Sequence, residues 1–184
     1  MKWICILLLL IVVSPGFSQN TTDSNYLAWS SKRRLTVTDF EIRIAGEKTS
    51  PSFAQFYIDY RTGPVDFMKK NFNDKVHTYF IRSASWIDTT ISMNISLRYQ
   101  QTLFDLSEVY ARQFRKQLKA NKKKSLYNDT YGKTLDAEIM TSFSKRRIDY
   151  DNETRWGQDE EKQQQWEKEI QKELSELSEF SNEK

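Results

Sequence analysis

The chain has 184 residues, a length typical of one domain, and a formal net charge of +3 at pH 7. A charge this close to balance leaves no electrostatic footprint for nucleic acid, so we expect no nucleic-acid partner. The single cysteine, Cys5, lies in an N-terminal apolar run. The rest of the chain therefore has no thiolate metal ligand, no catalytic thiol and no disulfide.

Residues 1–18 have the pattern of a secretory signal peptide. Lys2 supplies the positive charge, residues 4–13 form the apolar run, and the small residues Gly16 and Ser18 suit cleavage after Ser18. The run is too short to span a bilayer, where about 20 apolar residues are needed. We therefore expect an exported protein, periplasmic or secreted, with no integral membrane segment after signal removal.

A strand-like region follows a polar N-terminal segment, residues 19–34. Stretches at 35–46, 53–60 and 75–85 alternate apolar and polar side chains with a period of two, which predicts short β-strands. The region ends at about Ser85, and helical spacing begins shortly afterwards.

From about residue 91 the apolar residues recur at three- and four-residue steps, which predicts helices. The first helix carries a stripe made of Tyr99, Leu103, Leu106, Tyr110, Phe114 and Leu118. A second helix is marked by Leu135, Ile139 and Phe143, and a third by Trp166, Ile170, Leu174 and Leu177.

Strands that precede helices predict a single α+β domain, over residues 35–177. We expect residues 119–132 to form a loop, residues 150–157 a polar turn, and residues 178–184 a frayed C-terminal tail.

Residues 29–177 resemble a bacterial domain family of unknown function that is predicted to comprise secreted zinc-dependent proteases. The active-site helix of that family typically reads H-E-Q-G-H-F-D-I-A-E-x-Y-A-R, and residues 99–112 here read YQQTLFDLSEVYAR. The family's L-x-W-x-D-F segment is matched by LTVTDF at 35–40, and its S-W before the helix by Ser85 and Trp86. Its later Y-D-x-x-T-x-H-G segment is matched by YDNETRWG at 150–157.

The resemblance implies a zincin-like fold, with a small, mostly antiparallel sheet packed on a long helix and two further helices. In an H-E-x-x-H motif the two histidines hold zinc and the Glu is the general base. Tyr99 and Leu103 stand at the two histidine positions, Gln100 at the Glu, and Trp156 at the expected third ligand. Leu and Trp cannot ligate zinc, and a neutral Gln amide cannot take a proton from water.

We therefore expect no catalytic residue, no metal ligand and no cofactor, although the family itself is expected to bind zinc. The function that follows is a pseudoenzyme, a catalytically inactive relative of secreted zinc metallopeptidases. Its scaffold would serve to bind a peptide or protein partner.

Two other functions stay open. One is an active metal-dependent hydrolase with a non-standard site built from Tyr99 and the candidate binding residues Asp105, Glu108 and Asp151, whose oxygens also suit Ca²⁺. The other is a structural or assembly protein that docks through the apolar stripe of its last helix. The only histidine, His77, lies in the middle of a predicted strand, where we expect a hydrogen-bonded structural residue.

Overall fold

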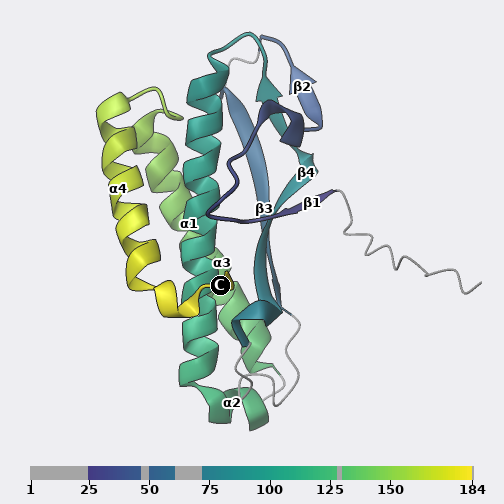
Figure 1. The fold of residues 1–184 in the computed structure, drawn as a ribbon, viewed down its shortest axis with the longest axis vertical. Coiled ribbons are helices and arrows are strands. Elements are labelled where there is room, and N and C mark those ends of the chain that lie inside the picture. The colour runs from purple at the N-terminus through teal and green to yellow at the C-terminus, as the bar shows by residue number, and fades with distance from the viewer. Residues whose placement is uncertain (1–24, 47–49, 61–71, 128–129, 184) are drawn as a thin grey trace, which may run out of the picture.

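The computed structural model of the protein describes residues 25–46, 50–60, 72–127 and 130–183 (Figure 1). The predicted signal peptide, residues 1–18, lies outside these ranges. In the described part of the chain, helices cover one face of a small mixed sheet. The prediction of an α+β fold is confirmed.

β4 (Val76–Asp88) is the central strand of a four-stranded sheet. β3 (Ser52–Tyr60) runs antiparallel along one side of β4. β1 (Tyr26–Ala28) and β2 (Ile42–Ile44) pair with successive parts of its other side, β1 antiparallel and β2 parallel. The register places Ile81 between Tyr26 and Gln55, and Trp86 between Ile42 and Phe53. Antiparallel pairing therefore predominates, as predicted.

The stretch 35–46 was predicted as one strand, but only its residues Ile42–Ile44, which are β2, form a strand. Before it lies a short 3-10 helix, η1 (Val37–Asp39). The Asp39 carboxylate accepts hydrogen bonds from the backbone nitrogen and the hydroxyl of Thr36, at 2.8 and 2.9 Å. This capping interaction turns the chain where the alternating pattern predicted a straight strand.

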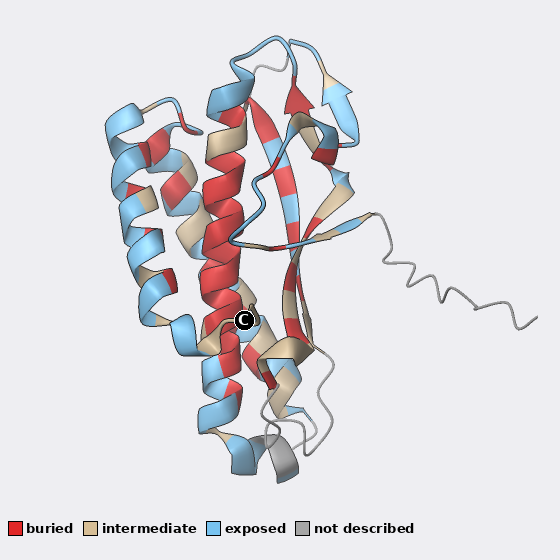
Figure 2. Cartoon of the chain, viewed as in Figure 1, coloured by how far each residue is buried: buried red, intermediate tan, exposed pale blue. Residues whose placement is uncertain are grey.

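α1 (Met93–Ala120) lies between the sheet and the other helices and is buried along its middle (Figure 2). Its predicted apolar stripe forms the centre of the hydrophobic core. The polar residues Gln100, Gln101 and Thr102 are buried as well. The middle of α1 is therefore buried on all sides, because neighbouring elements cover each of its faces.

α2 (Lys122–Tyr127) lies inside the predicted loop, and α3 (Tyr131–Thr154) continues into the predicted polar turn. The turn is therefore confined to residues 155–159. α4 (Glu160–Glu176) begins where the Asp159 carboxylate accepts the backbone N–H of Lys162, which is a standard helix N-cap.

The apolar stripe of α4 faces the interior. Trp166, Ile170 and Leu174 are buried in the core, where α4 packs against α1. The stripe therefore offers no surface for docking on another subunit, in contrast to the assembly role considered from the sequence.

Residues 178–183 are docked on the domain, in contrast to the expected frayed tail. They include a 3-10 helix, η4 (Ser178–Phe180). The Asn73 side-chain amide donates to the carbonyls of Glu179 and Ser181, each at 2.9 Å, and the Glu183 carboxylate accepts the backbone N–H of Ser31. These long-range contacts fix the segment, and no local pattern in the sequence signals them.

Candidate functional site

Tyr99, at the first ligand position of the resemblance, is a buried phenol with 1% of its surface exposed. Its hydroxyl donates a hydrogen bond to the Asp151 carboxylate on α3. Its ring stacks on Tyr150, with centroids 5.2 Å apart and planes 8° apart. Burial, together with the charge of Asp151 and the hydrogen bond to it, raises the pKa of Tyr99 well above its ordinary value. Tyr99 is therefore a neutral packing residue at physiological pH.

The turn after α3 presses on Tyr99. Arg155, Trp156 and Gly157 all have positive φ, at 49°, 55° and 82°. A Cβ added to Gly157 would lie 2.8 Å from the Cβ of Tyr99. The close approach to Tyr99 requires glycine here, and the left-handed backbone favours it. The structure thus brings the segment that carries Trp156 next to Tyr99, while the Trp156 side chain is 37% exposed.

Gln100 and Leu103 complete the degenerate motif, and both are completely buried. The Gln100 side-chain nitrogen donates to the Ser52 hydroxyl on β3 at 2.9 Å. Within the described residues its side-chain oxygen has no hydrogen-bond partner. Leu103 belongs to the hydrophobic core.

Asp151 connects Tyr99 to the edge of the sheet. Burial raises the pKa of Asp151, and the hydrogen bond from Tyr99 and the charge of Arg147 offset this only in part. Arg147 lies 3.8 Å from the other Asp151 oxygen and donates to the Ala54 carbonyl of β3 at 3.0 Å. Its guanidinium also covers the ring of Phe53, at 4.9 Å. Arg147 therefore covers β3 beside the degenerate motif.

Asp105, a candidate binding residue, is saturated with internal hydrogen bonds. Its Oδ1 accepts from Trp29 Nε1 and Gln101 Nε2, both at 2.9 Å. Its Oδ2 accepts from Gln171 Nε2 at 3.1 Å and lies 3.8 Å from Arg34. Burial raises the pKa of Asp105 although these donors act in the opposite direction. The carboxylate ties the N-terminal segment and α4 to α1.

Glu108, the second candidate, holds two buried arginines on its own helix. It accepts from Arg112 Nε at 2.9 Å and from Arg115 Nη1 at 2.8 Å. Arg115 also donates to the carbonyls of Val76 and Phe180. Arg112 donates to a third carbonyl, in α4. This network is structural, since each charged group has partners inside the protein.

The three candidate carboxylates do not form one site. Asp151 meets Tyr99, whereas Asp105 and Glu108 belong to the two separate networks described above. No group of three or more His, Cys, Asp or Glu side chains suited to a metal occurs within the described ranges.

His77, the only histidine, is hydrogen-bonded on both ring nitrogens. Nε2 lies 2.8 Å from the Asp74 carbonyl, and Nδ1 lies 2.9 Å from the Asn182 side-chain nitrogen. Because a carbonyl oxygen can only accept, Nε2 donates to Asp74. His77 thus helps to hold the C-terminal segment, which is a structural role.

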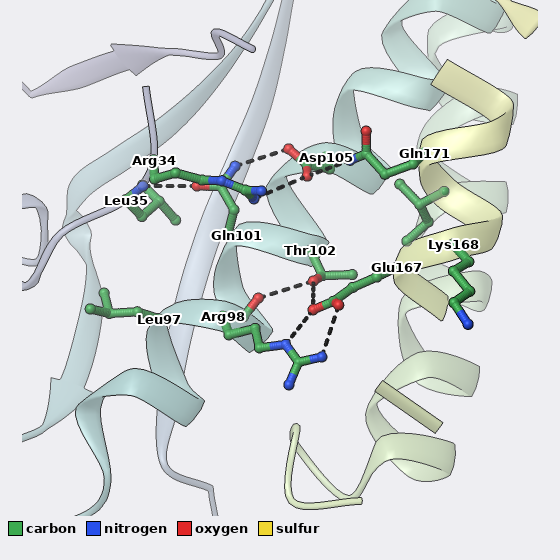
Figure 3. A pocket seen from close by; sticks show the side chains of 11 residues that line it. Arg34, Leu35, Leu97, Arg98, Gln101, Thr102, Asp105, Glu167, Lys168 and Gln171 are labelled. Carbon is green, nitrogen blue, oxygen red and sulfur yellow. Dashed lines mark hydrogen bonds and ion pairs between the residues drawn. The ribbon is translucent and has the colours of Figure 1, made fainter. Parts of the chain in front are cut away.

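A cleft lies elsewhere, between α1, α4 and the segment around Arg34 (Figure 3). It has a volume of about 530 Å³. Leu35, Leu97 and Ile170 give it apolar walls. A smaller hollow of about 290 Å³ adjoins it and shares Arg34 and Asp105 with it.

Sequence reasoning missed this cleft. Two of its charged residues, Arg98 and Glu167, lie on different helices and are joined by hydrogen bonds of 2.6 and 2.9 Å. Asp105 had been named as a candidate binding residue, because it belongs to the stretch 99–112 that resembles the family's active-site helix. The exposed position of Arg34 beside it has no signal in the sequence, because it depends on how the N-terminal segment crosses α1.

Comparisons of the chain with protein-family models, with curated proteins and with solved structures each found no match. The likeness to the zinc-protease family therefore stays a prediction based on the residues quoted above. Among the described residues, no helix is both long enough and apolar enough to cross a bilayer.

Proposed function

We propose that this protein is an exported, catalytically inactive, zincin-like relative of secreted zinc metallopeptidases, and that it acts as a binding module for a peptide or protein. One observation carries the proposal. The turn that holds Trp156 lies directly against Tyr99, through the contact of Gly157. In a zinc site built as the resemblance implies, these two segments have to meet, although they are far apart in the sequence.

The chemistry at these positions supports the absence of zinc hydrolysis. Leu103 and Trp156 offer no ligand atom, and Tyr99 is held as a neutral phenol, which is a poor zinc ligand. Gln100 cannot serve as a general base. Stacking of Tyr99 on Tyr150 fills space that unpaired, buried imidazoles would make costly.

The alternative of an active hydrolase with a non-standard site has less support. It needs Tyr99, Asp105, Glu108 and Asp151 around one ion. Asp105 and Glu108 accept hydrogen bonds from other donors. They follow Tyr99 by six and nine residues on α1, so their side chains leave the helix on other sides than Tyr99 does. We therefore favour the non-catalytic function.

The binding mode is constrained by Arg147. An extended peptide that adds a strand to a sheet needs free backbone groups along the edge strand. At Ala54 of β3, beside the degenerate motif, Arg147 already occupies the carbonyl. This favours binding at the cleft between α1 and α4 over strand addition at β3.

Metal analysis tests the proposal. The chain from Gln19 onward is purified without a histidine tag and dialysed against a buffer that contains zinc. Its metal content should then stay well below one zinc per chain. A variant with Tyr99→His, Gln100→Glu, Leu103→His and Trp156→His should bind about one zinc per chain if these positions once formed a site. The matched control keeps Leu103 and should bind zinc more weakly, because one ligand is missing.

One zinc per wild-type chain would overturn the proposed loss of the site. For the binding role, the mature chain should capture a specific partner from periplasmic extract. Failure to capture one would count against a peptide- or protein-binding module.

A further inference from the structure

The cleft between α1 and α4 lies on a different side of α1 from the degenerate motif. Gln101 and Asp105 line the cleft. Gln101 follows Tyr99 by two residues, and Asp105 follows Leu103 by two. Two residues correspond to a rotation of roughly 200° around an α-helix. Gln101 and Asp105 therefore lie on the opposite side of α1 from Tyr99 and Leu103.

The acidic groups of the cleft have hydrogen-bond partners within the protein. Glu167 accepts two hydrogen bonds from Arg98, at 2.6 and 2.9 Å, and Arg98 also pairs with Glu160 at 2.7 Å. Asp105 receives N–H donors from Trp29 and from two glutamines. A cationic ligand would find no carboxylate here that lacks a partner.

Arg34 is a positive group of the cleft that is only loosely paired. Its side chain is 75% exposed, and its ion pair with Asp105 is long, at 3.8 Å. Figure 3 shows the side chain lying across the cleft wall toward Asp105. Most of its N–H groups therefore stay available to an anion. Lys168, whose ammonium points away from the other side chains in Figure 3, adds positive charge at the rim.

The walls beside Arg34 are apolar. Leu35 follows it directly in the chain, and Leu97 and Ile170 lie across from it on α1 and α4. The backbone N–H of Leu35 is bonded to Gln101 Oε1 at 2.8 Å, which fixes this segment against α1. A planar guanidinium beside an apolar wall suits a carboxylate attached to an apolar group.

We propose that this cleft is a binding site for a carboxylate that carries an apolar group, with Arg34 bonding the carboxylate and the cleft walls at Leu35 and Leu97 contacting the apolar part. A volume of about 530 Å³ suits a ligand of this kind. The same chemistry occurs at a peptide C-terminus with an apolar last residue and in a free aliphatic carboxylate. The inference goes beyond the proposed function, because it holds whether or not the chain once bound zinc.

Calorimetric titration of the chain from Gln19 onward distinguishes the two sources. One arm uses the peptide Gly-Ala-Gly-Ala-Leu as free acid and as C-terminal amide. The other arm uses octanoate and octylamine. Binding of the peptide acid without the amide identifies a peptide C-terminus as the ligand. Binding of octanoate without octylamine or the peptide identifies an aliphatic carboxylate.

Arg34→Gln should weaken binding of the active acid by roughly tenfold or more, the value of one charge-assisted hydrogen bond. The exposed position of Arg34 makes this change compatible with folding, which thermal unfolding would verify. Arg43→Gln is the matched control, because it removes the same charge from an exposed position on β2, away from the cleft.

The proposal is overturned if neither acid binds at millimolar concentration, or if the amide and the amine bind equally well. It is also overturned if Arg34→Gln and Arg43→Gln leave the affinity equally unchanged. None of these outcomes depends on the zinc content of the protein, so a failure here is distinguishable from a failure of the proposed function.

Discussion

Gly157 lies so close to Tyr99 that a Cβ at position 157 would be 2.8 Å from the Cβ of Tyr99. The contact joins the turn after α3 to the buried face of α1. Because this turn carries Trp156, the contact also determines how Trp156 and Tyr99 lie relative to one another.

Gly157→Ala should therefore be strongly destabilising. The positive φ costs about 1 kcal/mol for a residue with a Cβ, and the steric overlap adds about 1–3 kcal/mol. Gly46→Ala is the matched control, because Gly46 has a similar φ of 77° but nothing within 4 Å of the added Cβ. Urea unfolding should show the larger loss at position 157. Equal losses at both positions would mean that Tyr99 does not restrict the turn.

Glu108→Gln should lower the free energy of unfolding by about 3–5 kcal/mol, because it leaves the buried guanidiniums of Arg112 and Arg115 without a carboxylate. Glu169→Gln, on α4, removes a carboxylate whose side chain is 61% exposed and should cost less than about 1 kcal/mol. Chemical denaturation of both variants provides the comparison. A cost at position 108 no greater than at position 169 would contradict a buried network.

Asp151 should make stability fall as pH rises. Its pKa is raised in the folded protein, chiefly by burial, so between its ordinary value of 3.8 and the raised value the folded state binds more protons than the unfolded state. Stability therefore decreases with pH in that window, by at most about 1.4 kcal/mol per pH unit, and levels off above it.

Asp151→Asn removes this dependence while it keeps an acceptor for Tyr99. The stability of the wild type minus that of the variant should decline from pH 3 upward and then become constant. Asp149→Asn, at an exposed position on the same helix, controls for the change in net charge. A difference that rises with pH would show that the carboxylate is stabilised, not penalised, by folding.

Export should depend on the N-terminal apolar run. When the full chain is expressed in a bacterium, the exported product should begin at Gln19, as determined by N-terminal sequencing. Leu8→Arg interrupts the run and should leave the chain unprocessed inside the cell. An exported product that still begins at Met1 would rule out cleavage after Ser18.

The sequence predicted the elements that have a clear period. Phe56 and Ile58 lie on the buried face of β3, as alternation required, and the stripe from Tyr99 to Leu118 packs in the core. β1 was not predicted, because a strand of three residues has no measurable period. Its existence depends on pairing with β4.

The site was predictable only in part. The approach of Tyr99 to the turn at 155–157 follows from the resemblance. The partners of Asp105 and Glu108 do not, since Trp29, Gln171 and Phe180 come from distant segments. The burial of Gln100 and Gln101 was also unexpected, because an amphipathic pattern assigns polar residues to solvent.

The contacts of Arg115 have a consequence for the order of folding. Its buried guanidinium needs the Val76 carbonyl, which precedes α1, and the Phe180 carbonyl, which follows α4. During synthesis from the N-terminus, η4 is the last described element to emerge. Without η4, the Arg115 guanidinium, in the C-terminal part of α1, lacks the Phe180 carbonyl as a partner. Burial of Arg115 with all of its partners therefore requires segments from both sides of α1 to be in place.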